Sequence, residues 1–478
     1  MRRSMIILAS ATFLSSCASM GGLSGDAGFG ADPVSDVAQL APKQWKSELE
    51  TTGLARVQPW VSSFGDEQVE QLVAEALAHN RNLAAGAARI EQALALAKVG
   101  GAARLPSVTL GASGTGNFVP NAANTDTYGG SVSASWELDV WGRVRDRANA
   151  GYRDADAAQA DFEALQLSVA GQTVSAWIDL YAASQQETLA ADDVQTRDRS
   201  LGIVQRRYKS GLSSSLDIRL ARSALAGSQA TRAFQKQQHA NAARRLEILL
   251  GRYPSNEIKA VAALPVLPQL DALGTPVDLL TRRPDVRAAE QRLSAAGLRV
   301  SEARKALLPT LSLSGSAKTG GGSIGDIFDF DRAIGQLIGS LSQPLFRGGA
   351  IKADIARNEA RLREQLETYA QIVLTAWREV EDALSGEVYL ADREAALQVS
   401  SVEANEAQRL AEREYVRGVG TIFELLDAQR RRISAEGQLI TATSARASNR
   451  VSLFLALGGD LKLQAVQTAN LNDEDSTT

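Results

Sequence analysis

The chain has 478 residues, with 51 Lys and Arg against 55 Asp and Glu and a net charge of -4. This length is enough to bury a large core. No basic patch with interleaved aromatic residues is present, so we expect no nucleic-acid partner. Two His and one Cys leave little for histidine catalysis, a zinc site or disulfides. We therefore expect no enzyme, no catalytic residue, no metal and no cofactor.

The N-terminus reads as an export signal. Arg2 and Arg3 precede an apolar run from Met5 to Leu14, which is about half the twenty residues that a membrane-spanning helix needs. The sequence Leu-Ser-Ser-Cys at 14–17 resembles the lipobox of bacterial lipoproteins, which implies lipidation at Cys17. An ordinary signal peptide with a stray cysteine is the weaker interpretation. No Asp follows Cys17 directly, which favours delivery to the outer membrane. We predict a signal peptide over 1–16.

A long internal repeat divides the rest of the chain. Elements at 89–93 and 103–110 return at 292–296 and 306–313, a shift of 203. Tyr208 to Gly211 returns as Tyr415 to Gly418, a shift of 207. We expect a duplicated gene. The predicted domains are a lipidated tether and equatorial segment over 17–59, repeat 1 over 60–253, an inter-repeat linker and equatorial segment over 254–280, repeat 2 over 281–458 and a tail over 459–478.

Proline placement predicts the helices. There is none between Pro120 and Pro254, and none after Pro344, and proline breaks helices. Apolar residues at helical spacing predict long helices over 143–208 and 350–415, each near 100 Å at about 1.5 Å per residue. Shorter helices are expected at 67–104, 216–250, 284–307 and 422–457, running opposite to the long helices and stacked end to end beside them. Such helices favour a tube, coiled coil or bundle wall.

Between the helices the apolar period changes to two. Val132, Ala134 and Trp136 alternate with Ser133 and Ser135. Strands are predicted at about 105–117, 128–140, 308–318 and 334–346, with loops at 118–127 and 318–332. They suit a transmembrane barrel, although a half-buried soluble sheet alternates in the same way. Four strands cannot close a barrel, which needs about eight or more. Several chains must then share one barrel.

The run from Leu280 to Glu290, followed by Leu308 to Leu313, resembles the signature of the TolC-like outer-membrane efflux proteins, in their OprM/NodT-type lipoprotein branch. The likeness covers Trp60 to Leu457. It implies a homotrimer in which a long-helix α-barrel tunnel continues a β-barrel shared by three chains. The expected fold class is mainly α with transmembrane β, in two structural repeats.

The resemblance also implies a function. The chain would be the passive exit duct of a tripartite drug or metal efflux pump, sited in the outer membrane among its lipids with the tunnel in the periplasm. Its partners would be a periplasmic adaptor and an inner-membrane transporter, RND type by expectation. A periplasmic coiled-coil adaptor or scaffold lipoprotein without a pore is the alternative, but two strand hairpins in a strict duplication argue against it.

The turn after each long helix is the candidate gate. Gly211 and Gly418 are suited to ending helices. Asp217 and Glu424 each stand at the third position of a capping box, so capping explains them as well as gating does. Capping does not explain Asp427, which lies three residues beyond Glu424 on the same helical face. The first repeat has Leu220 at this position, so the carboxylate pair belongs to the second repeat alone.

The resemblance implies that Glu424 and Asp427 ring the narrowest point of the tunnel, where repulsion among six carboxylates would raise some pKa values. It also implies a hydrogen bond between Tyr415 and Asp217 that holds a closed tip. Gly420 stands where the family has an Arg, and Arg417 is the expected substitute. The exposed turns are the expected adaptor-docking surface, with plain solvated turns as the alternative; they contain Gly211, Leu212, Ser213, Gly418, Val419 and Gly420.

Overall fold

A computed structural model describes residues 41–42, 44–47, 60–117, 125–260, 263–264, 267 and 275–459. The expected signal peptide, Cys17 and the tail beyond residue 459 lie outside these ranges. The chain forms two compact units, each drawing on both halves of the sequence. The first contains 97–151 and 293–366, and the second contains 42–96, 152–292 and 367–478. Within the described ranges, no helix combines the length and apolarity needed to cross a membrane.

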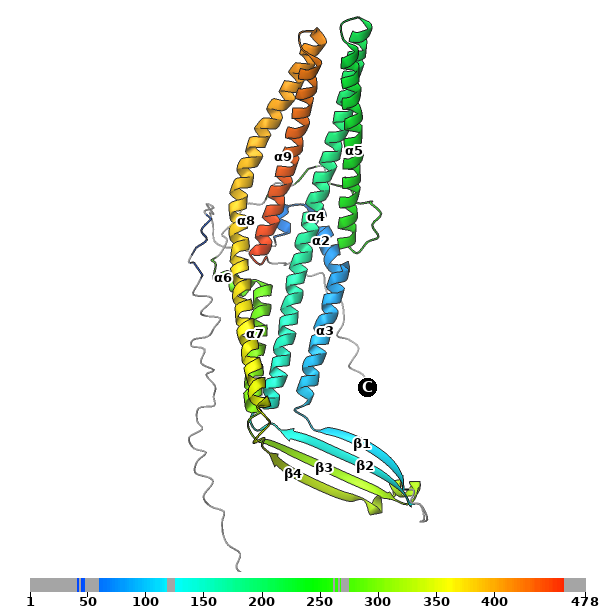
Figure 1. The fold of residues 1–478 in the computed structure, drawn as a ribbon, viewed down its shortest axis with the longest axis vertical. Helices are drawn as coiled ribbons and strands as arrows, with labels where there is room; N and C mark the ends of the chain where they lie inside the picture. Colours follow the sequence, from blue (N-terminus) through cyan, green and yellow to red (C-terminus); the bar gives the residue numbers. More distant parts are fainter. Residues whose placement is uncertain are drawn as a thin grey trace, which may run out of the picture. The chain divides into compact units, whose positions relative to one another are not determined.

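The first unit contains a sheet of four antiparallel strands in the order β1-β2-β3-β4 (Figure 1). Two hairpins, β1–β2 and β3–β4, are joined by an antiparallel pairing of β2 with β3, and within the described residues one edge of β1 and one edge of β4 have no partner strand. Four strands were expected, and the described residues contain four. Their bounds are β1 Ser107–Asn117, β2 Thr125–Leu138, β3 Thr310–Gly321 and β4 Ile334–Ser342.

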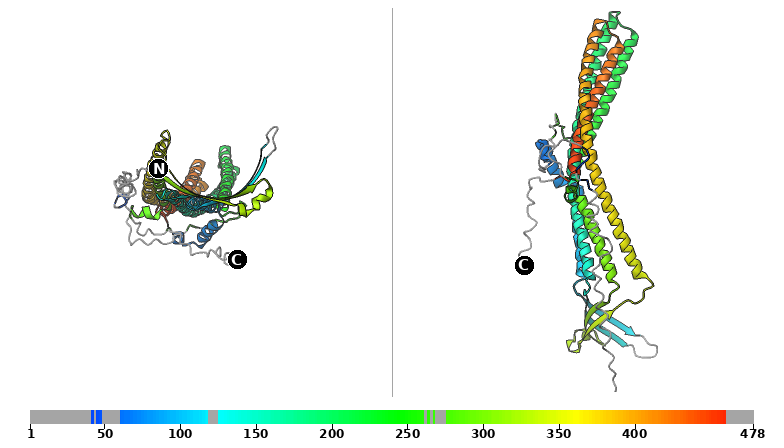
Figure 2. Two further views of the ribbon diagram at one scale, coloured as in Figure 1. Left: turned by 90° about the horizontal axis from the view of Figure 1, so that it is seen from below. Right: turned by 90° about the vertical axis from the view of Figure 1, so that its left-hand side faces the viewer.

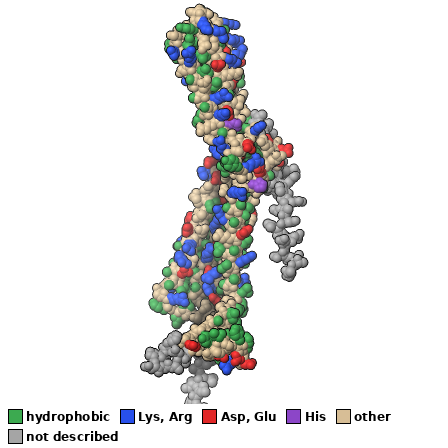
Figure 3. Space-filling view, turned by 90° about the vertical axis from the view of Figure 1, so that its right-hand side faces the viewer, with side chains coloured by type: hydrophobic (Ala, Val, Ile, Leu, Met, Phe, Trp, Pro, Cys, Tyr) green, Lys and Arg blue, Asp and Glu red, His purple; other side chains and the backbone are tan. Residues whose placement is uncertain are grey.

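One face of this sheet is apolar. The register places Leu110 opposite Val132 and Leu313 opposite Trp136, and alternation puts these side chains on the same face. Leu110 is 81% exposed in the single chain, and hydrophobic side chains gather on the sheet in Figure 3. The other face is lined mostly by Ser and Thr. A strongly exposed apolar face needs a non-aqueous neighbour.

Several expected strand bounds are corrected. β2 begins at Thr125, because the residues before Tyr128 continue the pairing with β1 as far as Asn117. β4 ends at Ser342 rather than at 346, since Pro344 has no N–H for a ladder. The loop expected over 318–332 is shorter. β3 continues to Gly321, and two short 3-10 helices follow, η3 Ile324–Phe328 and η4 Phe330–Arg332.

The second unit contains the greater part of two antiparallel helix hairpins, seen side by side in Figures 1 and 2. The first hairpin is α4 (Arg143–Lys209) with α5 (Ser215–Leu249), and the second is α8 (Ala350–Arg417) with α9 (Ile422–Ala456). These bounds agree with the expected helices to within two residues. The two long helices are continuous through both units.

The helix expected over 67–104 is two helices, α2 (Glu67–His79) and α3 (Arg81–Ala102). Asn80 separates them in an extended conformation with ψ 126°. Its Oδ1 accepts the N–H of Asn82 at 2.9 Å, and its Nδ2 donates to the carbonyl of Leu249 at 2.8 Å. The side chain therefore starts α3 and joins the end of α5 to it.

The second repeat makes the same junction with different chemistry. α6 (Asp278–Arg282) precedes α7 (Pro284–Lys305), and Arg283 between them donates to the carbonyl of Ala456 at 3.0 Å, at the end of α9. The same guanidinium pairs with Asp285 and Glu379, each at 2.7 Å. The expected end-to-end stacking is thus present in both repeats. At each junction a polar side chain donates a hydrogen bond to a terminal helix carbonyl, which has no partner within its own helix.

The main core of the second unit lies beside these junctions. Trp60, Phe64 and Phe454 pack ring against ring, with Trp60 and Phe454 stacked at 6.0 Å between centroids. Trp177 and Ile178 on α4 are fully buried in the same cluster. This core joins the two hairpins where α5 and α9 end, and a second, smaller cluster lies nearer their tips.

Candidate functional site

The two hairpin tips are built alike by their helix ends. Gly211 and Gly418 have φ of 74° and 86°, a left-handed conformation that glycine adopts without a steric penalty. Ser214 and Thr421 then begin the next helices with complete capping boxes. Each turn is therefore set by its local sequence. Among the expected docking residues, Leu212 is 67% and Val419 78% exposed.

Glu424 and Asp427 lie one turn apart at the start of α9, and each has a local partner. Thr421 donates its backbone N–H to the Glu424 carboxylate at 2.7 Å, which lowers the pKa of Glu424. Asp427 accepts from Arg430 and, at 2.6 Å, from Arg431, which lowers the pKa of Asp427. Within one chain both groups therefore stay ionised. The expected rise through repulsion between copies stays a prediction.

Tyr415 and Asp217 are not hydrogen-bonded to each other, contrary to expectation. The Asp217 carboxylate accepts from the hydroxyls of Ser213 at 2.6 Å and Ser214 at 2.8 Å. Burial raises the pKa of Asp217, but these hydrogen bonds outweigh it and the pKa is lowered overall. Tyr415 is 3% exposed, and its hydroxyl has no partner within the described part of the chain. Ser213 and Ser214 therefore donate to the carboxylate that was expected to accept a hydrogen bond from Tyr415.

A different residue, Arg207 near the end of α4, binds the second tip. Its Nη1 donates to the carbonyl of Tyr415 at 2.7 Å, and its guanidinium lies 4.9 Å from the centre of the Tyr415 ring. It also donates to the carbonyl of Leu212 in its own tip at 3.3 Å. The terminal carbonyls of a helix attract a cation. Arg207 thus ties the first hairpin to the second.

The expected substitute, Arg417, is exposed, and no side-chain hydrogen bond or ion pair of it occurs among the described residues. A Cβ at Gly420 would lie 3.2 Å from the backbone N of Tyr415, so a larger residue there would have to displace this turn. A comparison of the two repeats in the sequence could have identified Arg207. The shift of 207 pairs it with Glu414, a reversal of charge between the repeats.

A small apolar cluster lies just behind the tips. It draws one or two residues from each of the four hairpin helices, and all of them are buried; its members are Val204, Ala221, Tyr415, Ile422 and Leu425. Leu220 packs against it, at the position where the second repeat has Asp427. The first tip therefore uses this position for packing, and the second uses it for charge.

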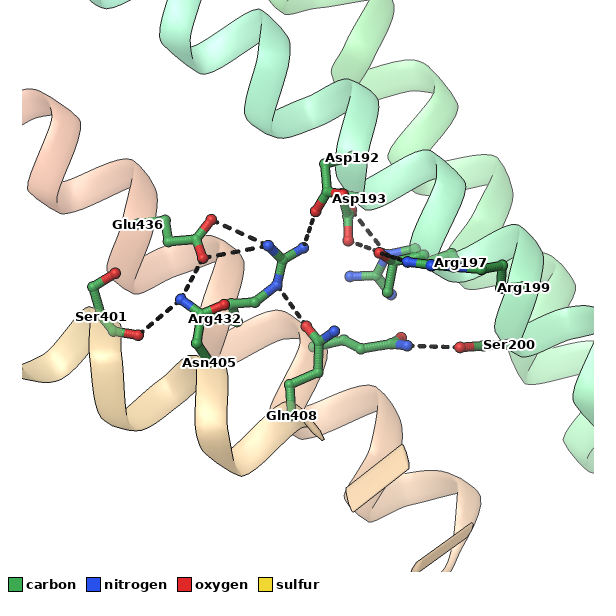
Figure 4. Close-up of polar contacts among 12 residues, drawn as sticks. Asp192, Asp193, Arg197, Arg199, Ser200, Ser401, Asn405, Gln408, Arg432 and Glu436 are labelled. Carbon is green, nitrogen blue, oxygen red and sulfur yellow. Dashed lines mark hydrogen bonds and ion pairs between the residues drawn. The ribbon is translucent and has the colours of Figure 1, made fainter. Parts of the chain in front are cut away.

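Further along the hairpins lies a polar cluster centred on Arg432 (Figure 4), here called the Arg432 cluster. Arg432 on α9 is 8% exposed in its side chain. It pairs with Asp192 on α4 at 2.8 Å and with Glu436 at 3.1 Å, and it donates to Gln408 on α8 at 2.6 Å. One buried cation therefore joins three helices and both hairpins.

Neighbouring polar residues extend the Arg432 cluster. Gln429 is fully buried and donates to Ser200 on α4 at 2.8 Å. Asn405 donates to Glu436 at 2.6 Å. Sequence patterns did not identify this cluster, because its residues come from three separate segments. The repeat shift does mark it, since Arg432 and Glu436 correspond to Leu225 and Gln229 in the first repeat.

Paired long helices with capped tips, joined to an open sheet with one apolar face, define a class of protein: an oligomeric channel with membrane strands and a helical tunnel wall. The comparisons agree with it. The model of the outer membrane efflux protein family matches twice, over residues 72–252 and 275–459. The chain therefore belongs to the outer membrane efflux protein family.

Individual relatives agree over nearly their whole length. The pyoverdine export outer membrane protein OpmQ of Pseudomonas putida is 32% identical over 434 residues, which cover 87% of this chain and 92% of OpmQ. The solved outer-membrane channel OprN is 28% identical with a TM-score of 0.79, covering 88% of this chain and 98% of that one. A solved structure of CusC is 26% identical with a TM-score of 0.79, covering 88% of this chain and 100% of that one. The fold and the function are those of an outer-membrane efflux channel, and the adaptor alternative is not supported.

Proposed function

We propose that three copies of this chain form the exit duct of a tripartite efflux pump. The observation that supports this most directly is the open four-stranded sheet with an exposed apolar face, in a chain of the outer membrane efflux protein family. One chain cannot satisfy the edges of β1 and β4, and a barrel removes such edges by closure. The duct acts as a passive conduit without catalytic residues, metal or cofactor.

The two matches to the family model support a division into repeat 1 (60–253) and repeat 2 (281–458), joined by the linker 254–280. We propose that Cys17 carries the lipid anchor, and that the segments 17–59, 254–280 and 459–478 belong to the equatorial region. Ser47 donates its backbone N–H to Glu381 at 2.9 Å, which supports a place for the N-terminal segment beside α8.

The gate, in this proposal, is the pair of hairpin tips. Glu424, Asp427, Asp217 and Tyr415 remain its proposed residues, and Arg207 is added because it binds the carbonyl of Tyr415. Asp217 acts within its own tip through its two serines. Opening would separate the second hairpin from the first, and it would break the contacts of Arg207 and of the Arg432 cluster.

The test of the duct is assembly and conductance. The full-length protein is extracted from outer membranes in detergent and run on a gel with and without boiling. We expect a trimer that dissociates on heating and that conducts in planar bilayers. A protein that stays soluble without detergent after delipidation, and that gives no conductance, would refute the duct and favour a scaffold.

The partners follow from the same proposal: a periplasmic adaptor at the exposed turns, and through it an inner-membrane transporter, of RND type by our inference. Photo-crosslinkers at Ser213 and Val419 should capture the adaptor encoded beside the channel gene. A matched crosslinker at exposed Phe234, in the middle of α5, serves as the control. Equal capture at all three positions would contradict docking at the tips.

A further inference from the structure

The loop between β3 and β4 lies at the end of the sheet that is remote from the helices, because β3 follows α7 and β4 leads to α8. It has a defined structure. Ser323 donates its backbone N–H to Asp326 at 2.8 Å and starts η3 with a capping box. Thr319 on β3 donates its hydroxyl to the carbonyl of Ile327 at 2.6 Å. The loop is therefore folded back against the sheet.

It covers the rim of the apolar face. Gly130 and Thr319 are paired in register and share a face with Val132 and Ala317. A Cβ at Gly130 would lie 2.8 Å from Cγ2 of Ile327, so the missing side chain makes room for the loop. At Gly321, on the same face, a Cβ would meet the side chain of Asp326. Two glycines thus admit the loop on the apolar side.

The loop presents large apolar side chains to its surroundings. Ile324 is 61% exposed, Phe328 71% and Phe330 76%. The acidic residues between them are partly compensated, since Arg332 pairs with Asp329 at 3.2 Å and with Asp326 at 3.7 Å. Exposed aromatic residues beside paired charges are costly in water but suit a boundary between water and hydrocarbon.

The strands themselves supply few aromatic residues at the outer end of the sheet. Among the residues of the four strands, Tyr128 and Trp136 are the aromatic ones. Trp136 donates to the carbonyl of Arg104 at 2.9 Å and so marks the end near the helices. Tyr128 alone marks the outer end. Membrane barrels carry aromatic girdles at both interfaces, and one tyrosine per four strands is a sparse girdle.

We infer that Ile324, Phe328 and Phe330 insert into the outer leaflet of the outer membrane, at the boundary between headgroups and acyl chains. This loop completes the outer aromatic girdle and sets the level of the barrel in the membrane. The inference rests on the proposed function, in which the apolar face of the sheet meets lipid.

The test uses nitroxide labels on the full-length trimer in vesicles of phosphatidylethanolamine and phosphatidylglycerol. Phe328→Cys and Phe330→Cys are labelled, and collision with lipid-soluble oxygen is compared with collision with a water-soluble nickel chelate. The references are Leu110→Cys on the apolar face, Ser133→Cys on the polar face and Asp331→Cys in the same loop. The unsubstituted protein controls for labelling at Cys17.

We expect the oxygen-to-nickel ratio at 328 and 330 to lie below that at 110 and to exceed that at 331 by about threefold, because water becomes scarce where the acyl chains begin. A ratio at 328 and 330 equal to that at 331 would overturn the inference. Protection from both reagents would overturn it too, since that indicates contact with protein. If Leu110→Cys itself behaves as Ser133→Cys does, the proposed membrane sheet fails, and the two failures are distinguishable.

Discussion

The two hairpins share one turn design but differ in what their inner faces contain. Tyr208 in the first tip is 47% exposed, whereas its counterpart Tyr415 is 3% exposed and lies under Arg207. On α9, Arg432 and Glu436 replace the Leu225 and Gln229 of α5. The two repeats therefore share a backbone design, and only the second hairpin carries Arg432 and Glu436 at these positions. Hydrogen bonds in a polar network strengthen one another, so they form and break cooperatively. This suits contacts between two hairpins that separate when the gate opens.

The largest effect is expected from Arg432→Leu, which gives the second hairpin the residue of the first. Asp192 and Glu436 would lose their shared cation. Because Asp192 is about half exposed, we expect a loss of about 2 kcal/mol rather than the full penalty of a buried pair. Hydrogen exchange near Ser200 and Gln429 should accelerate about 30-fold. Arg431→Ala removes an exposed charge from the same helix whose partner, Asp427, lies outside the Arg432 cluster, and it should leave these amides unchanged.

Arg207→Ala tests the contact between the tips. It removes three hydrogen bonds to carbonyls and a cation–aromatic contact, together about 1 to 2 kcal/mol. The channel should spend about tenfold more time in conducting states in planar bilayers. Arg206→Ala is the matched control, because Arg206 is exposed on the same turn. Equal conductance of the two variants would show that Arg207 does not hold the tip.

Measurements of ion selectivity distinguish the carboxylates of the second tip from that of the first. Glu424→Gln with Asp427→Asn should lower the cation-to-anion permeability ratio towards one, since fixed negative charge at a constriction favours cations. Asp217→Asn should change the ratio less than Glu424→Gln alone, because the first tip lacks the second carboxylate and has Leu220 there. Reversal potentials in a salt gradient measure this. An unchanged ratio in the double variant would remove Glu424 and Asp427 from the gate.

The smallest effect is a shift in the pH dependence of that selectivity. Hydrogen bonds lower the pKa values of Glu424 and Asp427 below the ordinary values of these carboxyls. The stabilisation of a group with a lowered pKa is present above its ordinary value and is lost as pH falls through the lowered one. Cation selectivity should then persist from pH 7 to about 5 and decline only in more acidic solution. Selectivity lost above pH 5 would instead mean that repulsion between copies dominates.

Much of this fold could be predicted from the sequence, because its elements are set by short-range rules. The absence of Pro after Pro344 left room for α8, and Gly211 and Ser214 fixed a turn and a cap within four residues. The break at Asn80 was missed, although the residue caps α3 locally. It lies in an otherwise helical pattern, and its extended conformation is stabilised by a distant carbonyl, that of Leu249.

The sequence by itself determined the duplication, the long helices, the four strands and the family. The duplication, the helices and the strands follow from repeat spacing, proline placement and apolar period, and the family follows from the resemblance of the run from Leu280 to Glu290. Only the tertiary structure decided that Arg207 binds the second tip, that Arg432 joins both hairpins, and that Asp217 binds its own serines instead of Tyr415. Such pairings depend on how neighbouring helices are rotated and aligned, and long side chains reach whichever partner that alignment brings near. The position of the β3–β4 loop was likewise decided in three dimensions, by space left at Gly130 and Gly321.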